Sequence, residues 1–207
     1  FEAVGVEHPP QVKTLKAAVV DRREAMQLLM GYNSFNGYVW NKLFDLQLIR
    51  ENDIRFHADY PACEDTMFVG NYLYHCSRVC VTEECLYCYR QVSGGANRGR
   101  YSGRKAYDPK WMSVFEMTEY MADLYKDDAV TAACRLHEVR EAGIVLRSME
   151  AAGYHGADHA RLKGILRRGA GLFFRDENSG RSQKLSVLLS CISPKLELAV
   201  WKLRNRK

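Results

Sequence analysis

Apolar residues in the first ninety positions recur at helical spacing in some stretches and alternate at strand spacing in others. Helical spacing predicts three helices, over residues 22–30, 34–50 and 65–75. Alternation predicts three strands, over residues 11–20, 78–81 and 85–90. Because helices and strands interleave in this part of the chain, it is expected to form an α/β unit.

The second half of the chain follows a clear break in this pattern. Residues 91–104 are rich in Gly, Ser and Arg and contain almost no apolar side chain. Helical spacing then predicts helices over residues 109–125, 129–151 and 157–168, and a last one that begins at Ser193-Pro194. The expected organisation is a first domain over residues 1–92, a linker or mobile loop over 93–106 and a mainly helical region over 107–207.

Local signals mark several element boundaries. Asp21 is followed three residues later by Glu24, which resembles a capping box. Asp108 precedes a proline at the first helical position, a common helix start. Residues 59–63 are expected to form a loop that delivers Glu64 and Asp65 to the start of the next helix.

Composition narrows the class of protein. The 207 residues are 47% hydrophobic and 27% charged, a balance typical of a globular protein. No apolar run approaches the roughly 18 residues that a membrane span needs. The seven cysteines lie among apolar neighbours and form no disulfide-scaffold pattern, so they are expected to be reduced thiols in the cytoplasm.

The positive charge is unevenly distributed. Residues 1–90 hold 9 Lys and Arg against 12 Asp and Glu, whereas residues 91–207 hold 21 against 13. A basic surface can attract an acidic partner or simply remain solvated, and both interpretations stay open. The end of the chain, residues 201–207, interleaves Trp201 and Leu203 with four cations. It predicts peripheral contact with the inner face of the plasma membrane, with a frayed basic tail as the alternative.

Two groups of residues are candidates for chemistry. Glu64 and Asp65 at a helix start are suited to capping that helix, but a carboxylate held there could also act as a general base. The second group predicts a zinc site that stabilises a basic binding module for nucleic acid or acidic lipid, although its spacing fits no standard zinc motif. Its thiols are Cys76, Cys80, Cys85 and Cys88, next to His75. A third interpretation is a structural piece whose exposed strand edges pair to form a homodimer.

Much of the first domain resembles the second half of the catalytic domain of bacterial family 2 glycosyltransferases. The order and spacing of the similar residues also match that family. The residues are Gly37-Tyr38-Val39-Trp40-Asn41-Lys42-Leu43-Phe44, Leu48-Ile49, Ile54-Arg55-Phe56, Glu64-Asp65 and Leu86-Tyr87-Cys88-Tyr89-Arg90. The resemblance implies the acceptor-side half of a GT-A domain, the fold of nucleotide-diphospho-sugar transferases, followed by a helical region.

The resemblance also implies a function. The parent enzyme would transfer a hexosyl group, with inversion, from a nucleotide-sugar donor to a hydroxyl of a glycan or lipid-linked acceptor in polysaccharide synthesis. Asp65 would be the general base and Glu64 its companion. The residues implied to bind substrate are Trp40, Lys42, Tyr89 and Arg90.

The same resemblance predicts that a part of the family's domain is missing. The family's nucleotide-binding segment and its Asp-x-Asp motif, which holds manganese or magnesium on the donor diphosphate, have no counterpart in the chain. The chain is therefore expected to be a C-terminal fragment, inactive without its donor-binding half. We expect a divalent cation in the intact parent, none bound to this fragment, and no nucleic-acid partner.

Overall fold

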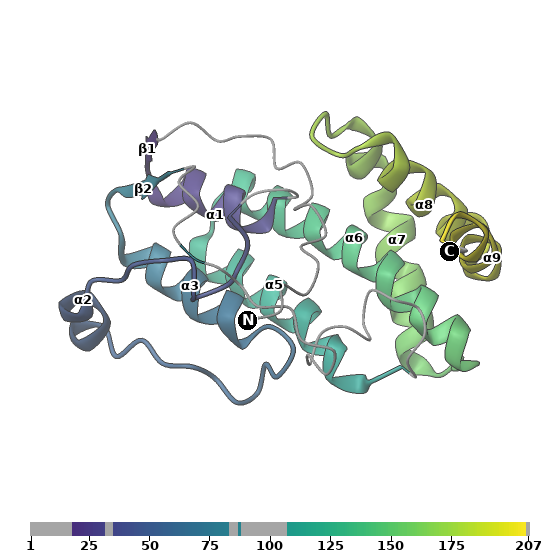
Figure 1. The fold of residues 1–207 in the computed structure, drawn as a ribbon, viewed down its shortest axis with the longest axis horizontal. Helices are drawn as coiled ribbons and strands as arrows, with labels where there is room; N and C mark the ends of the chain where they lie inside the picture. The colour runs from purple at the N-terminus through teal and green to yellow at the C-terminus, as the bar shows by residue number, and fades with distance from the viewer. Residues whose placement is uncertain (1–17, 32–34, 83–86, 88–106, 206–207) are drawn as a thin grey trace, which may run out of the picture.

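The computed structural model describes residues 18–31, 35–82, 87 and 107–205 of the chain. In these ranges, helices greatly outnumber strands (Figure 1). The strands are β1 (Ala18–Val20) and β2 (Val79–Val81). The helices are α1 (Arg22–Met30), α2 (Leu46–Glu51), α3 (Glu64–His75), the 3-10 helix η1 (Pro109–Met112), α5 (Ser113–Tyr125), α6 (Asp128–Ala152), α7 (Ala157–Arg175), α8 (Arg181–Ile192) and α9 (Pro194–Arg204).

The prediction of an α/β unit, and with it the acceptor-side half of a GT-A domain, is wrong. Among the described residues, β1 and β2 pair only with each other, antiparallel, with Val19 opposite Cys80. The apolar stripes of α1 and α3 therefore face other helices, not a sheet. Alternation over a few residues correctly located β2, but it could not show whether further strands would join it.

The predicted helix over residues 34–50 is also wrong in its first part. Residues 35–41 contain bends and a turn, residues 42–45 have no regular structure, and only α2 at its end is helical. Asn36 has a left-handed backbone with φ of 54°. The Lys42 ammonium donates hydrogen bonds to backbone carbonyls of this segment, and a helix would have used the same carbonyls for its own hydrogen bonds.

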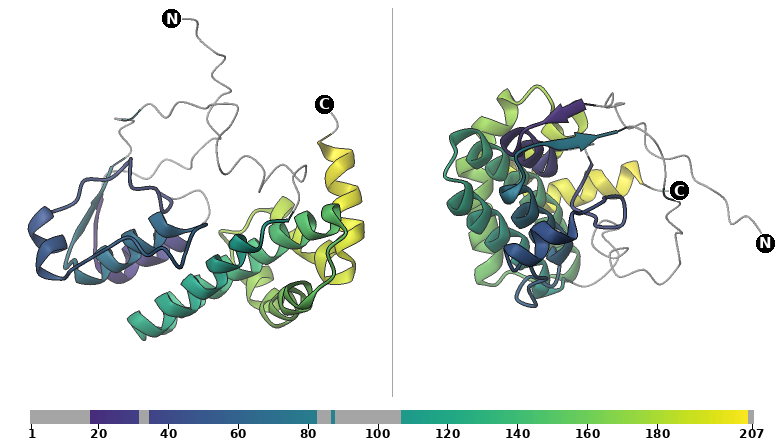
Figure 2. Two further views of the ribbon diagram at one scale, coloured as in Figure 1. Left: turned by 90° about the horizontal axis from the view of Figure 1, so that it is seen from below. Right: turned by 90° about the vertical axis from the view of Figure 1, so that its left-hand side faces the viewer.

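Among the described residues, the apolar core consists of two clusters joined by one helix. The first cluster packs α1, α3 and α5 against the start of α6, where Val130 and Cys134 are buried. The second packs η1, α7 and α8 against the later part of α6, around Val145 and Leu146. The α6 helix thus runs between the two ends of the molecule, with β1 and β2 at one end and α9 at the other (Figures 1 and 2).

Local sequence explains why α6 is so long. Asp127 caps its start by accepting hydrogen bonds from the backbone N–H groups of Ala129 and Val130. Gly153 ends it in a left-handed conformation, with φ of 68°. The predicted helix over residues 129–151 is confirmed, whereas α7 continues seven residues beyond its predicted end at residue 168. Within the described residues, no helix is both long and apolar enough to cross a membrane.

Candidate functional site

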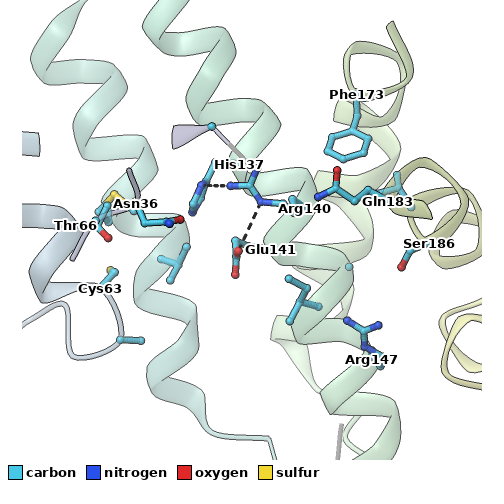
Figure 3. Close-up of a pocket in the computed structure, with 18 of the residues that line it drawn as sticks. Asn36, Cys63, Thr66, His137, Arg140, Glu141, Arg147, Phe173, Gln183 and Ser186 are labelled. Carbon is cyan, nitrogen blue, oxygen red and sulfur yellow. Dashed lines mark hydrogen bonds and ion pairs between the residues drawn. The ribbon is translucent and has the colours of Figure 1, made fainter. Parts of the chain in front are cut away.

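A cleft of about 920 Å³ opens between the first cluster of helices and the last two helices. One wall is the turn at residues 36–38 together with the start of α3, the floor is α6, and the other wall is α8 and α9. Figure 3 shows Asn36, Cys63 and Thr66 on one side and Gln183 and Ser186 on the other. The cleft therefore brings together segments more than 100 residues apart in sequence.

The loop before α3 places both predicted carboxylates on the cleft wall. The α3 helix begins at Glu64, as the sequence predicted, and Cys63 occupies the capping position without a side-chain capping bond. The Cys63 thiol instead donates to the carbonyl of Ser113 on α5, at 3.5 Å. This contact fixes the loop end against the core, so Glu64 and Asp65 both line the opening.

Asp65 is partly buried and interacts with the neighbouring turn. Its carboxylate accepts a hydrogen bond from the backbone N–H of Val39. Burial raises the pKa of Asp65 above its ordinary value, and the charge of Glu64 raises it further; the Val39 bond and Lys42 act in the opposite direction. Asp65 is thus a partly buried carboxyl group at the edge of the cleft.

Lys42 holds the turn beside Asp65. Its Nζ lies 2.7 Å from the carbonyl oxygen of Asn36, 2.8 Å from that of Tyr38 and 3.2 Å from that of Phe35. It also donates to Oδ1 of Asn41 at 2.8 Å. Burial lowers the pKa of Lys42 to about 8, against the opposing effect of Asp65. Because the ammonium has three protons and four oxygen neighbours here, it organises the turn in this structure.

Trp40 belongs to a row of three aromatic rings. It stacks on Tyr38, with ring centroids 5.1 Å apart and planes 19° apart, and lies 4.9 Å from Tyr87 at a tilt of 30°. Tyr38 and Tyr87 are 43% and 55% exposed. Tyr38 also lines the cleft. The structure therefore presents an exposed aromatic surface next to Asp65.

Some of the remaining predicted residues lie outside the described ranges, while Cys76 and Cys80 of the predicted zinc site lie within them, Cys80 as an exposed residue of β2. Tyr89 and Arg90 lie outside the described residues, as do Cys85 and Cys88 of the predicted zinc site. Cys76 is partly buried at the end of α3, where its thiol donates to the carbonyl of Tyr72 at 3.4 Å. Burial raises the pKa of the Cys76 thiol.

Sequence reasoning missed the polar floor of the cleft, which lies on α6. Arg140 donates to Nδ1 of His137 at 2.6 Å and to the carbonyl of Met30 at 3.0 Å. The Nε of Arg140 lies 3.9 Å from a carboxylate oxygen of Glu141, which is buried (Figure 3). Farther along, Arg147 pairs with Glu197 of α9. His137 is three residues from Arg140 and four from Glu141, so the three share one face of the helix, and this spacing was the signal that could have identified them.

Comparison with protein-family models, with curated proteins and with solved structures gave no match. The fold and the cleft therefore define the candidate site by their own geometry.

Proposed function

We propose that this chain takes part in glycosyl transfer, as in the family 2 glycosyltransferases that residues 37–90 resemble. In the proposal, the Asp65 carboxylate removes the proton from an acceptor hydroxyl while the hydroxyl oxygen bonds to the anomeric carbon of a nucleotide sugar. The nucleoside diphosphate leaves with the bonding electrons, and the configuration at that carbon inverts. The transferred group would be a hexose.

One observation carries the proposal: Asp65 lies partly buried on the wall of a cleft large enough for sugar rings. A general base must reach the acceptor and must not be fully solvated, and this position meets both needs. Its raised pKa makes it a stronger base than an ordinary aspartate once it is ionised. The position also supports the interpretation of a base over that of a helix cap, because the carboxylate interacts with Val39 of another segment.

The aromatic row supports an acceptor that is a glycan. Aromatic rings stack on the apolar faces of sugars, and Tyr38 and Tyr87 leave their rings accessible. Glu64, exposed beside Asp65, could accept hydrogen bonds from sugar hydroxyls and raises the pKa of the base. Trp40 and Lys42 would act by positioning this surface and the turn that carries it.

The cation that such an enzyme uses on its donor diphosphate does not fit the described part of this cleft. The chain contains no Asp-x-Asp motif. Among the described residues, the one group of three metal-competent side chains lies elsewhere, at the junction of α6 and α7. We therefore assign the cleft to the acceptor side of the reaction and derive no step through a metal.

Replacing Asp65 with Asn tests the proposal. The assay measures transfer from nucleotide sugars to oligosaccharide acceptors, with the chain expressed together with any coding sequence that precedes it. Asp65→Asn should lower the transfer rate by about 10²- to 10⁴-fold, the usual contribution of a general base. Asp123→Asn, an exposed position on α5, is the matched control and should leave the rate unchanged.

Circular dichroism should show the same helical content in both variants and in the wild type. Transfer by Asp65→Asn at the wild-type rate would exclude Asp65 as the base. Saturation-transfer NMR measures oligosaccharide binding by the wild type and by Asp65→Asn. If neither binds an oligosaccharide, that result counts against the acceptor site itself.

A further inference from the structure

A second group of polar side chains lies away from the cleft, where α6 turns into α7. Glu150 is in the last turn of α6, His155 is in the connecting loop, and His159 is in the first turn of α7. Each offers one ligand atom, and the three atoms all lie within 4.8 Å of one another. None of the three residues lines the cleft, so this group is separate from the proposed transferase site.

We propose that Glu150, His155 and His159 bind a divalent transition-metal ion of the zinc class. The Nε2 of His159 lies 2.8 Å from a carboxylate oxygen of Glu150, and Nδ1 of His155 lies 3.7 Å from the same oxygen. In a tetrahedral zinc site, ligand atoms about 2.0–2.2 Å from the ion are roughly 3.3–3.6 Å apart. Small rotations of the side chains would therefore bring all three atoms onto one ion.

The Glu150 carboxylate is shielded from solvent and lies in contact with both histidines. Its side chain is only 4% exposed. A carboxylate removed from water requires a positive charge or several hydrogen bonds to offset its lost hydration. In the described part of the chain, its side-chain partners are the two imidazoles, which are good ligands for zinc when they are neutral.

The loop that carries the ligands is held in place by its neighbours. Gly153 reverses the chain with φ of 68°, and the N–H of Tyr154 then donates to the carbonyl of Met149 at 2.9 Å. The ring of Tyr154 packs on Tyr107, with centroids 4.8 Å apart. These contacts fix the backbone on the N-terminal side of His155.

The C-terminal side is anchored through the same aromatic residue. The hydroxyl of Tyr107 donates to Oδ2 of Asp158 at 2.8 Å, one residue before His159. A Cβ at Gly156 would overlap the phenol of Tyr154, so a larger residue here would displace this ring from its present position. The ligands are therefore presented by a preorganised turn, which reduces the entropy lost on binding an ion.

Ligand chemistry and exposure define what the site would accept. Two nitrogens and one carboxylate oxygen suit Zn²⁺, Co²⁺ and similar ions, whereas Mg²⁺ and Ca²⁺ prefer sites built from oxygen ligands. The His155 side chain is 48% exposed, so the ion has a route from solvent. Three protein ligands would leave a fourth position for water.

Titration of the purified full chain with Zn²⁺ in a calorimeter tests the proposal. The expected result is one equivalent bound to the wild type and an affinity lowered at least tenfold in both His155→Gln and His159→Gln. His57→Gln, at an exposed position elsewhere, is the matched control and should bind as the wild type does. His155→Gln alters an exposed loop side chain, so its fold should persist even if that of His159→Gln does not.

The cysteines could also bind the zinc that the calorimeter detects. Titration with Co²⁺ distinguishes binding by thiolates from binding by Glu150, His155 and His159. Cobalt bound by imidazole and carboxylate gives visible absorption bands without the intense near-ultraviolet bands of a thiolate complex. Visible bands that vanish in His155→Gln support the site. Thiolate bands, equal affinity in all variants, or no binding would overturn it.

Discussion

Arg147 and Glu197 form a buried ion pair that joins α6 to α9. Nη1 of Arg147 lies 3.1 Å from Oε1 of Glu197, and the two side chains are 10% and 3% exposed. The Ser186 hydroxyl donates to the same oxygen at 2.6 Å, while the guanidinium lies 5.0 Å from the ring centre of Trp201. The other carboxylate oxygen of Glu197 is buried without a hydrogen-bond partner in the described part of the chain.

Replacing Arg147 with Met removes the positive charge while keeping a long side chain. The Glu197 carboxylate would then be buried with no opposing charge, a loss that typically lowers the free energy of unfolding by about 3–5 kcal/mol. In a protein of this size, 1 kcal/mol shifts Tm by about 2–4 °C, so Tm should fall by roughly 6–20 °C. Adding Glu197→Leu should recover most of this loss, because no buried charge remains.

The pH dependence of this loss follows from the carboxyl group. Burial already raises the pKa of Glu197, and Arg147 opposes that effect. Without Arg147 the pKa should rise further, so the folded protein would bind a proton at a pH where the unfolded chain does not. The stability of Arg147→Met should therefore increase as pH is lowered, and its deficit should be smaller at pH 5 than at pH 8.

Urea unfolding followed by circular dichroism at both pH values measures these differences. Arg161→Met is the matched control, because it breaks the exposed pair with Glu119, whose atoms are 3.3 Å apart and whose side chains are 38% and 63% exposed. Exposed pairs contribute about 0–1 kcal/mol. If Arg147→Met lowered the free energy of unfolding by no more than this control at both pH 5 and pH 8, the argument from desolvation would be refuted.

Three other predictions concern the candidate site and the start of α1. Because the pKa of Asp65 is raised, transfer should decline on acidification at a pH above the ordinary aspartate value of about 3.9, which a pH–rate profile measures. Gly37→Ala should lower stability by about 1–3 kcal/mol in urea unfolding, since a Cβ would overlap Thr66, whereas Gly171→Ala, with open space around it, should not. Asp21→Ala removes the cap of α1 and should cost about 1 kcal/mol; Asp21→Asn should retain most of it.

Part of the candidate site could be predicted from sequence. The position of Glu64 and Asp65 at a helix start followed from the loop predicted over residues 59–63 and from the helical apolar spacing after it, and α3 confirms that start. The turn beside them could not be predicted in this way. The spacing of apolar residues in this turn indicated a helix. In the structure, the Lys42 ammonium donates hydrogen bonds to the carbonyls of three residues of the turn, which a helix would have used for its own backbone bonds. Whether Lys42 reaches these carbonyls depends on distances in space, which the spacing of residues along the sequence does not give.

The fold class was also beyond what the spacing of apolar residues could predict. The interleaved strands and helices suggested an α/β unit, yet the apolar faces of α1 and α3 pack against helices, and β1 pairs with β2 alone among the described residues. A stripe of apolar side chains records that one face is buried. It does not record whether a sheet or another helix covers that face.

The sequence by itself determined the local features: the helix starts at Asp21 and Asp108, and the apolar faces of the long helices. These depend on contacts within a few residues of each other along the chain. Only the tertiary structure decided that Asp65 faces a cleft lined by α6, α8 and α9, and that Glu150 meets two histidines across a chain reversal. Such groupings depend on how whole helices pack, because packing brings together side chains that local hydrogen bonding and periodicity do not relate.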